Sequence, residues 1–147
     1  LAKQARELGF EGGFIVMDQA KLDEMKAITG GTYEQLEGAI GTIPLVNAGY
    51  PGTDQFVEKY RKKYNIDPGA EAGFHYMSVY IFVEAMKAAK NVDDAKTIRA
   101  HMQDALDALP DDKKVYDVPS IDKNGGFKIP VRVAAIENGE IVYIEEN

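Results

Sequence analysis

Apolar residues recur with a helical period in some stretches of the chain and form short continuous runs in others, so the sequence predicts both helices and strands. Residues 1–9 carry apolar side chains at helical spacing, and Gly9 is placed to end that helix. The apolar run over residues 13–17 predicts a fully buried strand. A helical pattern follows over residues 20–29 and stops at the glycine pair 30–31.

Helical patterns dominate the middle of the chain. Thr53 is placed to cap a helix whose apolar face includes Phe56. The stretch 70–90 has the most apolar helical pattern, with no charged residue over 72–83. Because it is too short to span a bilayer, it predicts a core helix. Before these helices, Pro44 interrupts an extended segment and indicates a sheet edge or a crossing between subdomains, because proline cannot donate a ladder hydrogen bond.

The last third of the chain predicts one more helix and the end of a sheet. A regular helical period runs through residues 95–109. A turn over residues 122–126 leads into a strand predicted over 127–136. Asn138-Gly139 stands between two apolar runs, and this dipeptide favours a two-residue hairpin turn of type I′.

Composition excludes several classes of protein. The 147 residues are enough for one core, and 45% hydrophobic content is ordinary for a globular protein. The net charge of −7 disfavours a nucleic-acid or anionic-membrane partner, which would need clustered Lys and Arg. The absence of cysteine excludes disulfides, Cys-ligated zinc and a thiol nucleophile.

One acidic residue stands where an α/β protein would bind a small molecule. Asp18 follows the predicted strand 13–17 and precedes a helix. In open α/β sheets the carboxyl ends of strands face the ligand crevice, so this carboxylate is a candidate counter-charge for a cationic group. The alternative is that Asp18 only caps the following helix, which stabilises a helix by about 1 kcal/mol.

The remaining chemical motifs do not indicate catalysis, a metal or a cofactor. Residues 122–124 begin like a calcium loop, but the twelfth position is Val133 instead of a bidentate acid. His75 and His101 lack the spacing of metal ligands. The glycine pairs have no phosphate-binding spacing, and no nucleophile motif of the GxSxG type occurs. We therefore expect no cofactor, no metal and no enzyme activity.

Several segments together carry a resemblance to a known family. They are Ala2 to Phe10, Gly13-Phe14-Ile15, Asp18, Gly30-Gly31, Glu37-Gly38, Pro68, Gly73, Tyr76, Val79, Tyr80 and Glu84-Ala85-Met86. In this order they resemble the leucine/isoleucine/valine-binding family of bacterial ABC-transporter solute receptors, and specifically its C-terminal part. The resemblance covers nearly all 147 residues.

The resemblance implies three ligand-binding residues. In the family, the acid after this strand commonly pairs with the α-ammonium of a bound amino acid, and that role falls on Asp18, with Gln19 beside it. Glu71 matches the place of an aromatic residue that touches the ligand side chain, where it would favour a ligand with a second positive or donor group. The alternative for Glu71 is a first-turn acid that complements the helix dipole.

The implied fold is a partial α/β fold of the type I periplasmic-binding-protein kind. Residues 1–45 and 127–147 would belong to the C-terminal lobe of a two-lobed receptor, and residues 46–126 to helices of the N-terminal lobe and a crossover segment. The half of the receptor that takes the ligand carboxylate would be absent, so the chain would hold half a binding site.

The implied function is that of a solute-binding receptor of an ABC importer. It would bind a branched-chain or related amino acid between its lobes and deliver it to a membrane permease. It would be periplasmic or extracellular, and any export signal or lipid anchor would precede Leu1. Two alternatives stay open: a ligand-sensing regulatory domain of the same architecture that controls a partner protein, and an α/β enzyme.

Overall fold

The computed structural model describes residues 1–17, 21–129 and 131–144. The chain forms two compact units. Unit 1 comprises Leu1–Pro44 and Val131–Asn147, and unit 2 comprises Leu45–Pro130. Each unit has its own cluster of buried apolar side chains, and helices and strands occur in the same chain, as the sequence predicted.

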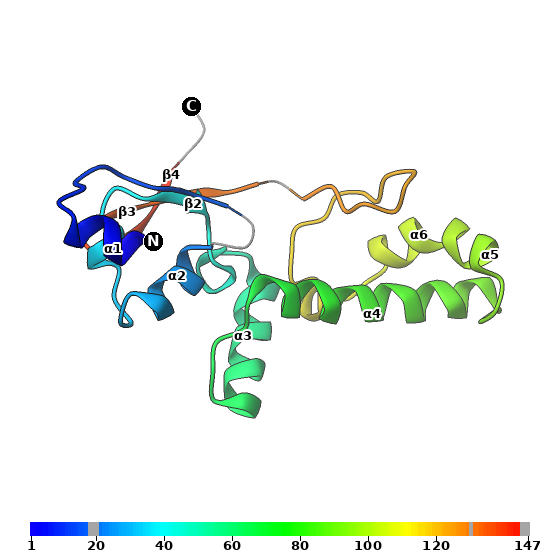
Figure 1. Ribbon diagram of the computed structural model, residues 1–147. Coiled ribbons are helices and arrows are strands. Elements are labelled where there is room, and N and C mark those ends of the chain that lie inside the picture. Colours follow the sequence, from blue (N-terminus) through cyan, green and yellow to red (C-terminus); the bar gives the residue numbers. More distant parts are fainter. Residues whose placement is uncertain (18–20, 130, 145–147) are drawn as a thin grey trace. The chain divides into compact units, whose positions relative to one another are not determined.

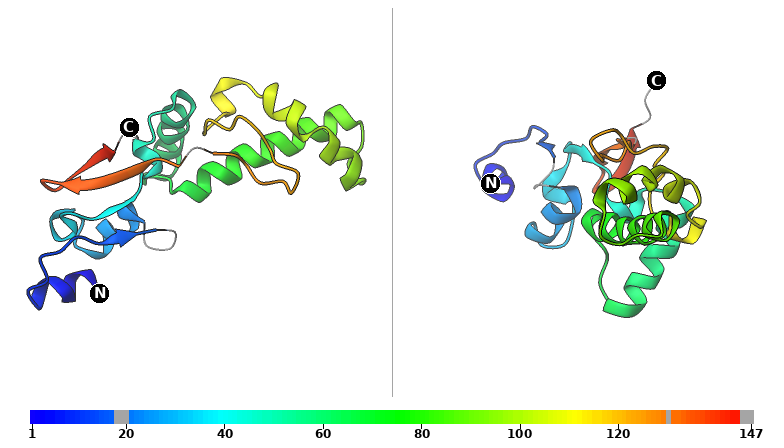
Figure 2. Two further views of the ribbon diagram at one scale, coloured as in Figure 1. Left: turned by 90° about the horizontal axis from the view of Figure 1, so that it is seen from above. Right: turned by 90° about the vertical axis from the view of Figure 1, so that its right-hand side faces the viewer.

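Unit 1 is built around a four-stranded sheet with the order β1-β2-β3-β4 (Figure 1). Its elements are α1 (Ala2–Glu7), β1 (Ile15–Val16), α2 (Leu22–Ile28), the 3-10 helix η2 (Glu34–Leu36), β2 (Ile40–Thr42), β3 (Val133–Glu137) and β4 (Glu140–Ile144). Strands β1 and β2 are parallel, whereas β3 is antiparallel to both β2 and β4. The orange and red hairpin lies beside the cyan strand β2 in the left view of Figure 2.

One face of this sheet carries the buried cluster of unit 1. Val16, Ala134 and Ile136 are buried there together with Leu22, the first residue of α2, and Leu36 of η2. The early helical and 3-10 segments therefore cover this face, and they bring residues from the two ends of the chain into a single core.

The opposite face of the sheet is more exposed, although Ala135 at its centre is buried. Ile15, Ile40 and Val142 belong to one line of cross-strand neighbours that runs through Ala135, so they lie on the same face. Their exposed fractions are 82%, 42% and 38%. The prediction that residues 13–17 form a fully buried strand is therefore wrong, because β1 is a two-residue edge strand covered on one face only.

The hairpin prediction at Asn138-Gly139 is confirmed. Glu137 pairs with Glu140, which leaves a two-residue turn, and Asn138 and Gly139 have φ angles of 54° and 74°, the positive values of a type I′ turn. The carboxylate of Glu37 accepts hydrogen bonds from both turn nitrogens, at 2.9 Å from Asn138 and 3.0 Å from Gly139. A residue a hundred positions earlier in the chain thus holds the turn.

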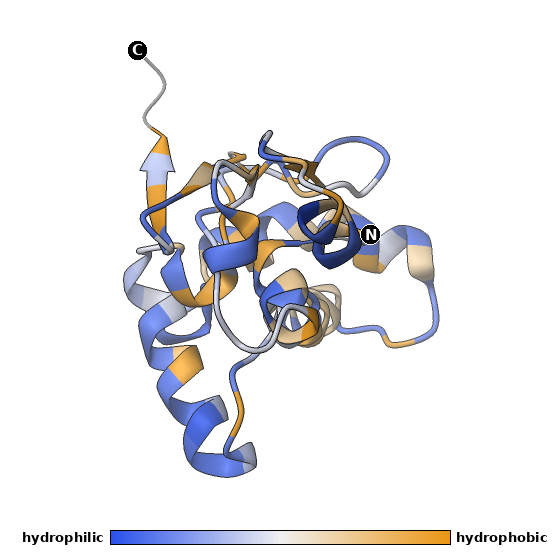
Figure 3. Ribbon diagram, turned by 60° about the vertical axis from the view of Figure 1, so that its left-hand side comes forward, coloured by the Kyte–Doolittle hydropathy of each residue, from blue (hydrophilic) through white to orange (hydrophobic). Residues whose placement is uncertain are grey.

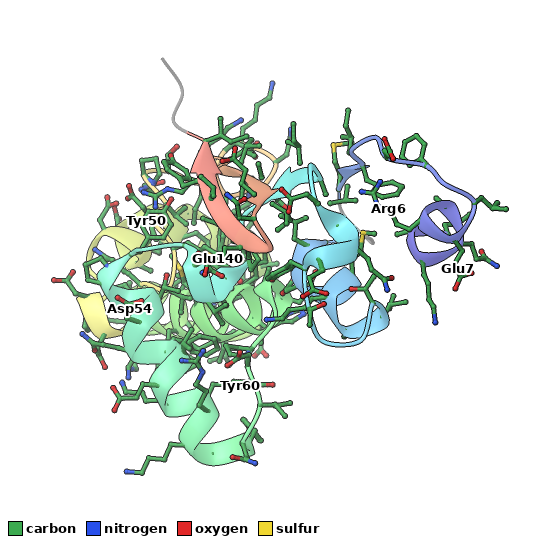
Figure 4. The ribbon with its side chains drawn as sticks, turned by 90° about the vertical axis from the view of Figure 1, so that its left-hand side faces the viewer. Arg6, Glu7, Tyr50, Asp54, Tyr60 and Glu140 are labelled. Carbon is green, nitrogen blue, oxygen red and sulfur yellow. The ribbon has the colours of Figure 1, made fainter. Side chains whose placement is uncertain are left out.

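Arg6 ties α1 to the loops around it (Figure 4). Its guanidinium donates to the carbonyl oxygens of Phe10 and Gly12, each at 2.7 Å, and to that of Glu37 at 2.9 Å. It also lies 4.9 Å from the ring centroid of Phe14. These contacts link the first helix to the segment that enters β1.

Unit 2 is helical. Its elements are the 3-10 helix η3 (Leu45–Asn47), α3 (Pro51–Tyr64), α4 (Ala70–Ala89), α5 (Ala95–Ala100), α6 (Met102–Asp107) and the 3-10 helix η4 (Asp111–Lys113). Figure 1 shows α5 and α6 running back along the long helix α4. The helix predicted over 70–90 is confirmed, whereas the single helix predicted over 95–109 is two helices that meet at His101.

The prediction that Thr53 caps a helix is wrong. Helix α3 begins at Pro51 with Tyr50 as its N-cap, and the hydroxyl of Thr53 donates instead to the carbonyl oxygen of Val115. Gly52 lies so close to the same segment that a Cβ atom there would be 1.8 Å from the carbonyl oxygen of Lys114. The start of α3 is thus fixed by a segment some sixty residues later.

The core of unit 2 runs along one side of α4. Met77, Ile81 and Ala85 are fully buried there, whereas Val79 and Phe82 on the other side are 60% and 47% exposed. The predicted core helix is therefore buried on one side only. Helix α3 is more hydrophilic than α4 over most of its surface (Figure 3).

The segments on either side of the unit boundaries differ from the predictions in two respects. The strand predicted over 127–136 begins only at Val133, and before it Ile121 and Phe127 form an isolated bridge around the predicted turn. Pro44 is the last residue of the first segment of unit 1, and β2 lies between β1 and β3. The sheet-edge interpretation of Pro44 is therefore wrong, whereas the alternative, a crossing between subdomains, agrees with its place at the unit boundary. The assignment of the units to receptor lobes stays a prediction.

Candidate ligand-binding site

The first predicted site is the segment between β1 and α2. Asp18 and Gln19 lie outside the described residues, but both flanks are defined. Val16, at the end of β1, is 5% exposed, and Leu22, at the start of α2, is fully buried. The residues predicted to bind ligand therefore follow the carboxyl end of a strand and precede a helix, as the sequence pattern indicated.

The capping role that is the alternative for Asp18 also falls on a residue outside the described ranges, and the structure defines only the start of α2. The N-cap of α2 is Lys21, with extended φ and ψ of −64° and 153° and no capping side-chain hydrogen bond. Lys21 lies 3.9 Å from Glu24 in the first turn, so the start of α2 already contains an ion pair.

The second predicted site, Glu71, lies in the first turn of α4. Its side chain is exposed, and the N-cap of the helix, Gly69, offers no side-chain cap. The hydroxyl of Tyr116 donates to the carbonyl oxygen of Ala70 at 2.7 Å, and the Tyr116 ring stacks on Phe74 with centroids 4.4 Å apart. The backbone around Glu71 is therefore held by the buried Tyr116, which stacks on the partly buried Phe74.

The pKa of Tyr116 is affected by the charge of Glu71 at the start of α4. Burial raises the pKa of its phenol well above the ordinary value, and the negative charge of Glu71 raises the pKa further. An anionic phenolate is thus strongly disfavoured beside Glu71, whereas a cation would be favoured there. A carboxylate in this position also complements the positive end of the helix dipole, so both interpretations of Glu71 fit its surroundings.

Sequence reasoning missed Tyr116. It lies at a bend between Val115 and Asp117, in a segment where no helical period or turn motif marks an aromatic residue as important. Its role depends on Gly73, whose missing side chain leaves room for it, since a Cβ there would lie 3.1 Å from the Tyr116 hydroxyl. Only the fold brings these residues together.

The two predicted sites belong to different units, Asp18 and Gln19 to unit 1 and Glu71 to unit 2. Each unit therefore supplies one candidate carboxylate. Both are acceptors for a positively charged or hydrogen-bond-donating ligand group.

Unit 2 also contains a groove of about 1030 Å³ between α4, α5, α6 and residues 121–129. Apolar side chains such as Phe74, Phe82 and Phe127 line most of it. The polar side chains at its edge are engaged in the fold: Gln103 accepts from the backbone of Ile121 at 2.9 Å, and Arg99 donates to the carbonyl oxygen of Lys123.

Two further properties hold for residues 1–17, 21–129 and 131–144. No group of three or more His, Cys, Asp or Glu side chains in these ranges is arranged to hold a metal ion. None of the helices there is both long and apolar enough to cross a bilayer.

Comparison with known proteins identifies the family. Residues 1–140 match a family described as periplasmic binding protein. The chain belongs to this periplasmic binding protein family. The resemblance proposed from the sequence is confirmed, and a comparison with curated protein sequences gives no match.

Two solved structures of binding proteins share the fold. A leucine-binding protein, LivK, of Thermotoga maritima matches with a TM-score of 0.71 and 27% identity, over 98% of this chain and 39% of its own. An ABC transporter substrate-binding protein of Desulfitobacterium hafniense matches with a TM-score of 0.57 and 18% identity, over 97% of this chain and 39% of its own.

These matches confirm the predicted fold class, a partial α/β fold of the type I periplasmic-binding-protein kind. The chain spans about two fifths of the length of either solved neighbour. Because the family and both neighbours are binding proteins, the prediction that the chain is not an enzyme is also confirmed.

Proposed function

We propose that the chain is part of a solute receptor of an ABC importer, which binds a branched-chain or related amino acid between two lobes and delivers it to a membrane permease. The observation that carries this proposal is the match of 98% of the chain, at 27% identity, to a leucine-binding protein of the same family. The family also supports a periplasmic or extracellular location.

In this proposal units 1 and 2 contribute to different lobes. Unit 1 supplies Asp18 and Gln19 from the segment after β1, and unit 2 supplies Glu71 from the start of α4. Asp18 accepts a hydrogen bond from the ligand α-ammonium, a charge-assisted bond that contributes about 1.5–3 kcal/mol. Gln19 offers both a donor and an acceptor beside it.

Glu71 influences which amino-acid side chain the ligand can have. Its carboxylate is exposed and lies on a helix start that Tyr116 holds in place. A ligand with a second donor or a positive charge would gain from this acceptor, whereas an aliphatic side chain would not. Glu71→Gln should therefore weaken binding of a basic or polar amino acid more than binding of leucine.

The test is the affinity of the intact receptor for amino acids. Asp18→Ala should weaken binding by about 10- to 150-fold, the factor that corresponds to one charge-assisted hydrogen bond, without changing the fold. Isothermal titration calorimetry measures the affinity, after a thermal-shift screen has found the ligand, since a ligand that binds only the native state raises Tm.

Glu24→Gln is the matched control, because Glu24 is an exposed carboxylate on α2 that pairs with Lys21 at 3.9 Å. It removes the same charge six positions further along the sequence and should leave the affinity nearly unchanged. Equal affinities of the wild type and Asp18→Ala would remove Asp18 from the site. Absence of a thermal shift with every amino acid would refute the ligand class.

A further inference from the structure

The chain contains two Asn-Gly steps, Asn124-Gly125 and Asn138-Gly139. Asparagine before glycine is prone to spontaneous deamidation, because glycine leaves the following backbone nitrogen free to approach the side-chain amide carbon. By sequence alone the two steps are equivalent. Their surroundings in the structure differ in charge, in hydrogen bonding and in the rigidity of the backbone.

The surroundings of Asn138 disfavour deamidation. The nitrogen of Gly139, which would have to attack, donates to the carboxylate of Glu37 at 3.0 Å, and the nitrogen of Asn138 donates to the same carboxylate at 2.9 Å. An anion that accepts an N–H bond favours the protonated form of that nitrogen, whereas the attacking form is deprotonated. The turn also closes a hairpin of the four-stranded sheet, which limits rotation of Asn138.

The Asn124 step lies in a turn outside the sheet. The nitrogen of Gly125 donates to a neutral acceptor, the carbonyl oxygen of Asp122, at 2.9 Å. The loop is closed by one isolated bridge, between Ile121 and Phe127, instead of a strand ladder. Asn124 therefore does not lie in the connection of a strand ladder, whereas Asn138 does.

The charges around the Asn124 step also differ. The guanidinium of Arg99 donates to the carbonyl oxygen of Lys123, and a Cβ atom at Gly125 would lie 3.1 Å from one of its nitrogens. A positive charge here favours loss of the Gly125 amide proton. The carboxylate of Asp122 binds the nitrogens of Asn124 and Gly126, and Lys128 lies 3.6 Å from it. Gly125 itself is not held by a carboxylate.

We propose that Asn124 is a site of spontaneous deamidation in this protein and that Glu37 protects Asn138 from the same modification. The Gly125 nitrogen loses its proton to water and forms a bond to the Asn124 side-chain carbon. The side-chain nitrogen then leaves as ammonia, and a cyclic succinimide remains. Water opens this ring to aspartate or isoaspartate, so the net change is addition of water and loss of ammonia, with no oxidation or reduction.

The modification would change the edge of the groove in unit 2. Asp122, Lys123 and Gly125 all line that groove. Deamidation adds a negative charge beside Asp122, and isoaspartate adds one carbon to the backbone. Either product should weaken the hydrogen bonds that Asp122 makes to residues 124 and 126.

The experiment follows both sites in the purified protein during incubation at pH 8 and 37 °C. Pepsin digestion at acidic pH, which suppresses further deamidation, and mass spectrometry then measure the modified fraction at each asparagine. We expect Asn124 to react about tenfold or more faster than Asn138, the factor that corresponds to one charge-assisted hydrogen bond. In urea the two rates should become nearly equal, because only the fold separates them.

Variants isolate the role of Glu37. Glu37→Ala and Glu37→Gln should each raise the Asn138 rate and leave the Asn124 rate unchanged, with circular dichroism reporting the fold. Glu140→Gln removes a carboxylate from the hairpin that does not bind the turn nitrogens, and it should change neither rate. A native Asn138 rate that equals or exceeds that of Asn124, or no change in both Glu37 variants, overturns the proposal.

Discussion

A single phenol positions the start of the long helix α4. Tyr116 donates to the carbonyl oxygen of Ala70, packs its ring on Phe74 and fills the space left by Gly73. Glu71 is exposed on the same turn, so its usefulness to a ligand depends on a backbone that Tyr116 holds. Tyr116 is a positioning residue, and a stability measurement can detect its role.

Tyr116→Phe should lower the free energy of unfolding by about 0.5–1.5 kcal/mol, because it leaves the Ala70 carbonyl oxygen without this donor. The substitution should also change how the free energy of unfolding depends on pH. The pKa of the Tyr116 phenol is raised in the folded state, so the unfolded state loses its proton first and stability falls as pH rises above the ordinary value of 10.0.

Urea denaturation at pH 8 and above pH 10 measures both effects. The wild type should lose stability between these conditions, and Tyr116→Phe should lose less. Tyr143 is 45% exposed, so Tyr143→Phe is the matched control and should keep the wild-type slope. Identical slopes for the wild type and Tyr116→Phe would show that the phenol is not held neutral by the fold.

At the scale of elements, the start of helix α3 is decided by a close contact with residues 111–118. The Gly52 backbone approaches the carbonyl oxygen of Lys114, and the Thr53 hydroxyl binds the next carbonyl oxygen, that of Val115. Residue type alone predicted a capping threonine. The buried hydroxyl finds its acceptor in another segment because a polar group without a partner in a core is costly.

Gly52→Ala should destabilise the protein by about 1–3 kcal/mol, since the added Cβ would lie 1.8 Å from the Lys114 carbonyl oxygen and α3 would have to move away. Chemical denaturation measures this loss. Gly69→Ala is the control at another helix start, where the nearest atom to an added Cβ is a Glu71 carboxylate oxygen at 3.5 Å. It should cost less than Gly52→Ala, and equal losses would contradict the contact.

At the scale of the whole molecule, the chain has two separate cores. Leu22 and Ile136 belong to the cluster of unit 1, and Met77 and Ile81 to that of unit 2. Unit 1 is assembled from both ends of the chain, whereas unit 2 is one continuous stretch. A cavity in one cluster should therefore destabilise mainly the unit to which that cluster belongs.

Leu22→Ala leaves a cavity in the cluster of unit 1 and should destabilise that unit by about 2–5 kcal/mol. Amide hydrogen exchange should then speed up in β2 and β3, while the amides of α4 keep their wild-type rates. Ile81→Ala is the reciprocal control and should affect α4 instead. If both variants accelerated exchange in both units alike, the two clusters would behave as one cooperative core.

Local signals in the sequence were enough for several features of this protein. The helix α4, the turn at Asn138-Gly139 and the strand end before Asp18 follow from helical periodicity, from a dipeptide that accepts positive φ and from a short apolar run. The family resemblance covered the fold class. These features depend on residues that are close together in the sequence, so they can be predicted from the sequence alone.

Tertiary structure alone decided the rest. The apolar run at Ile15 is one-sided because only one face of its sheet is covered, and Thr53, Tyr116 and Glu37 act through partners 62, 46 and about a hundred residues away. A residue's type limits what it can bind, but the long-range contacts of the folded chain determine which partner it meets. The sequence therefore specified the type and approximate position of most elements, and the fold decided their exact ends, their exposure and their contacts.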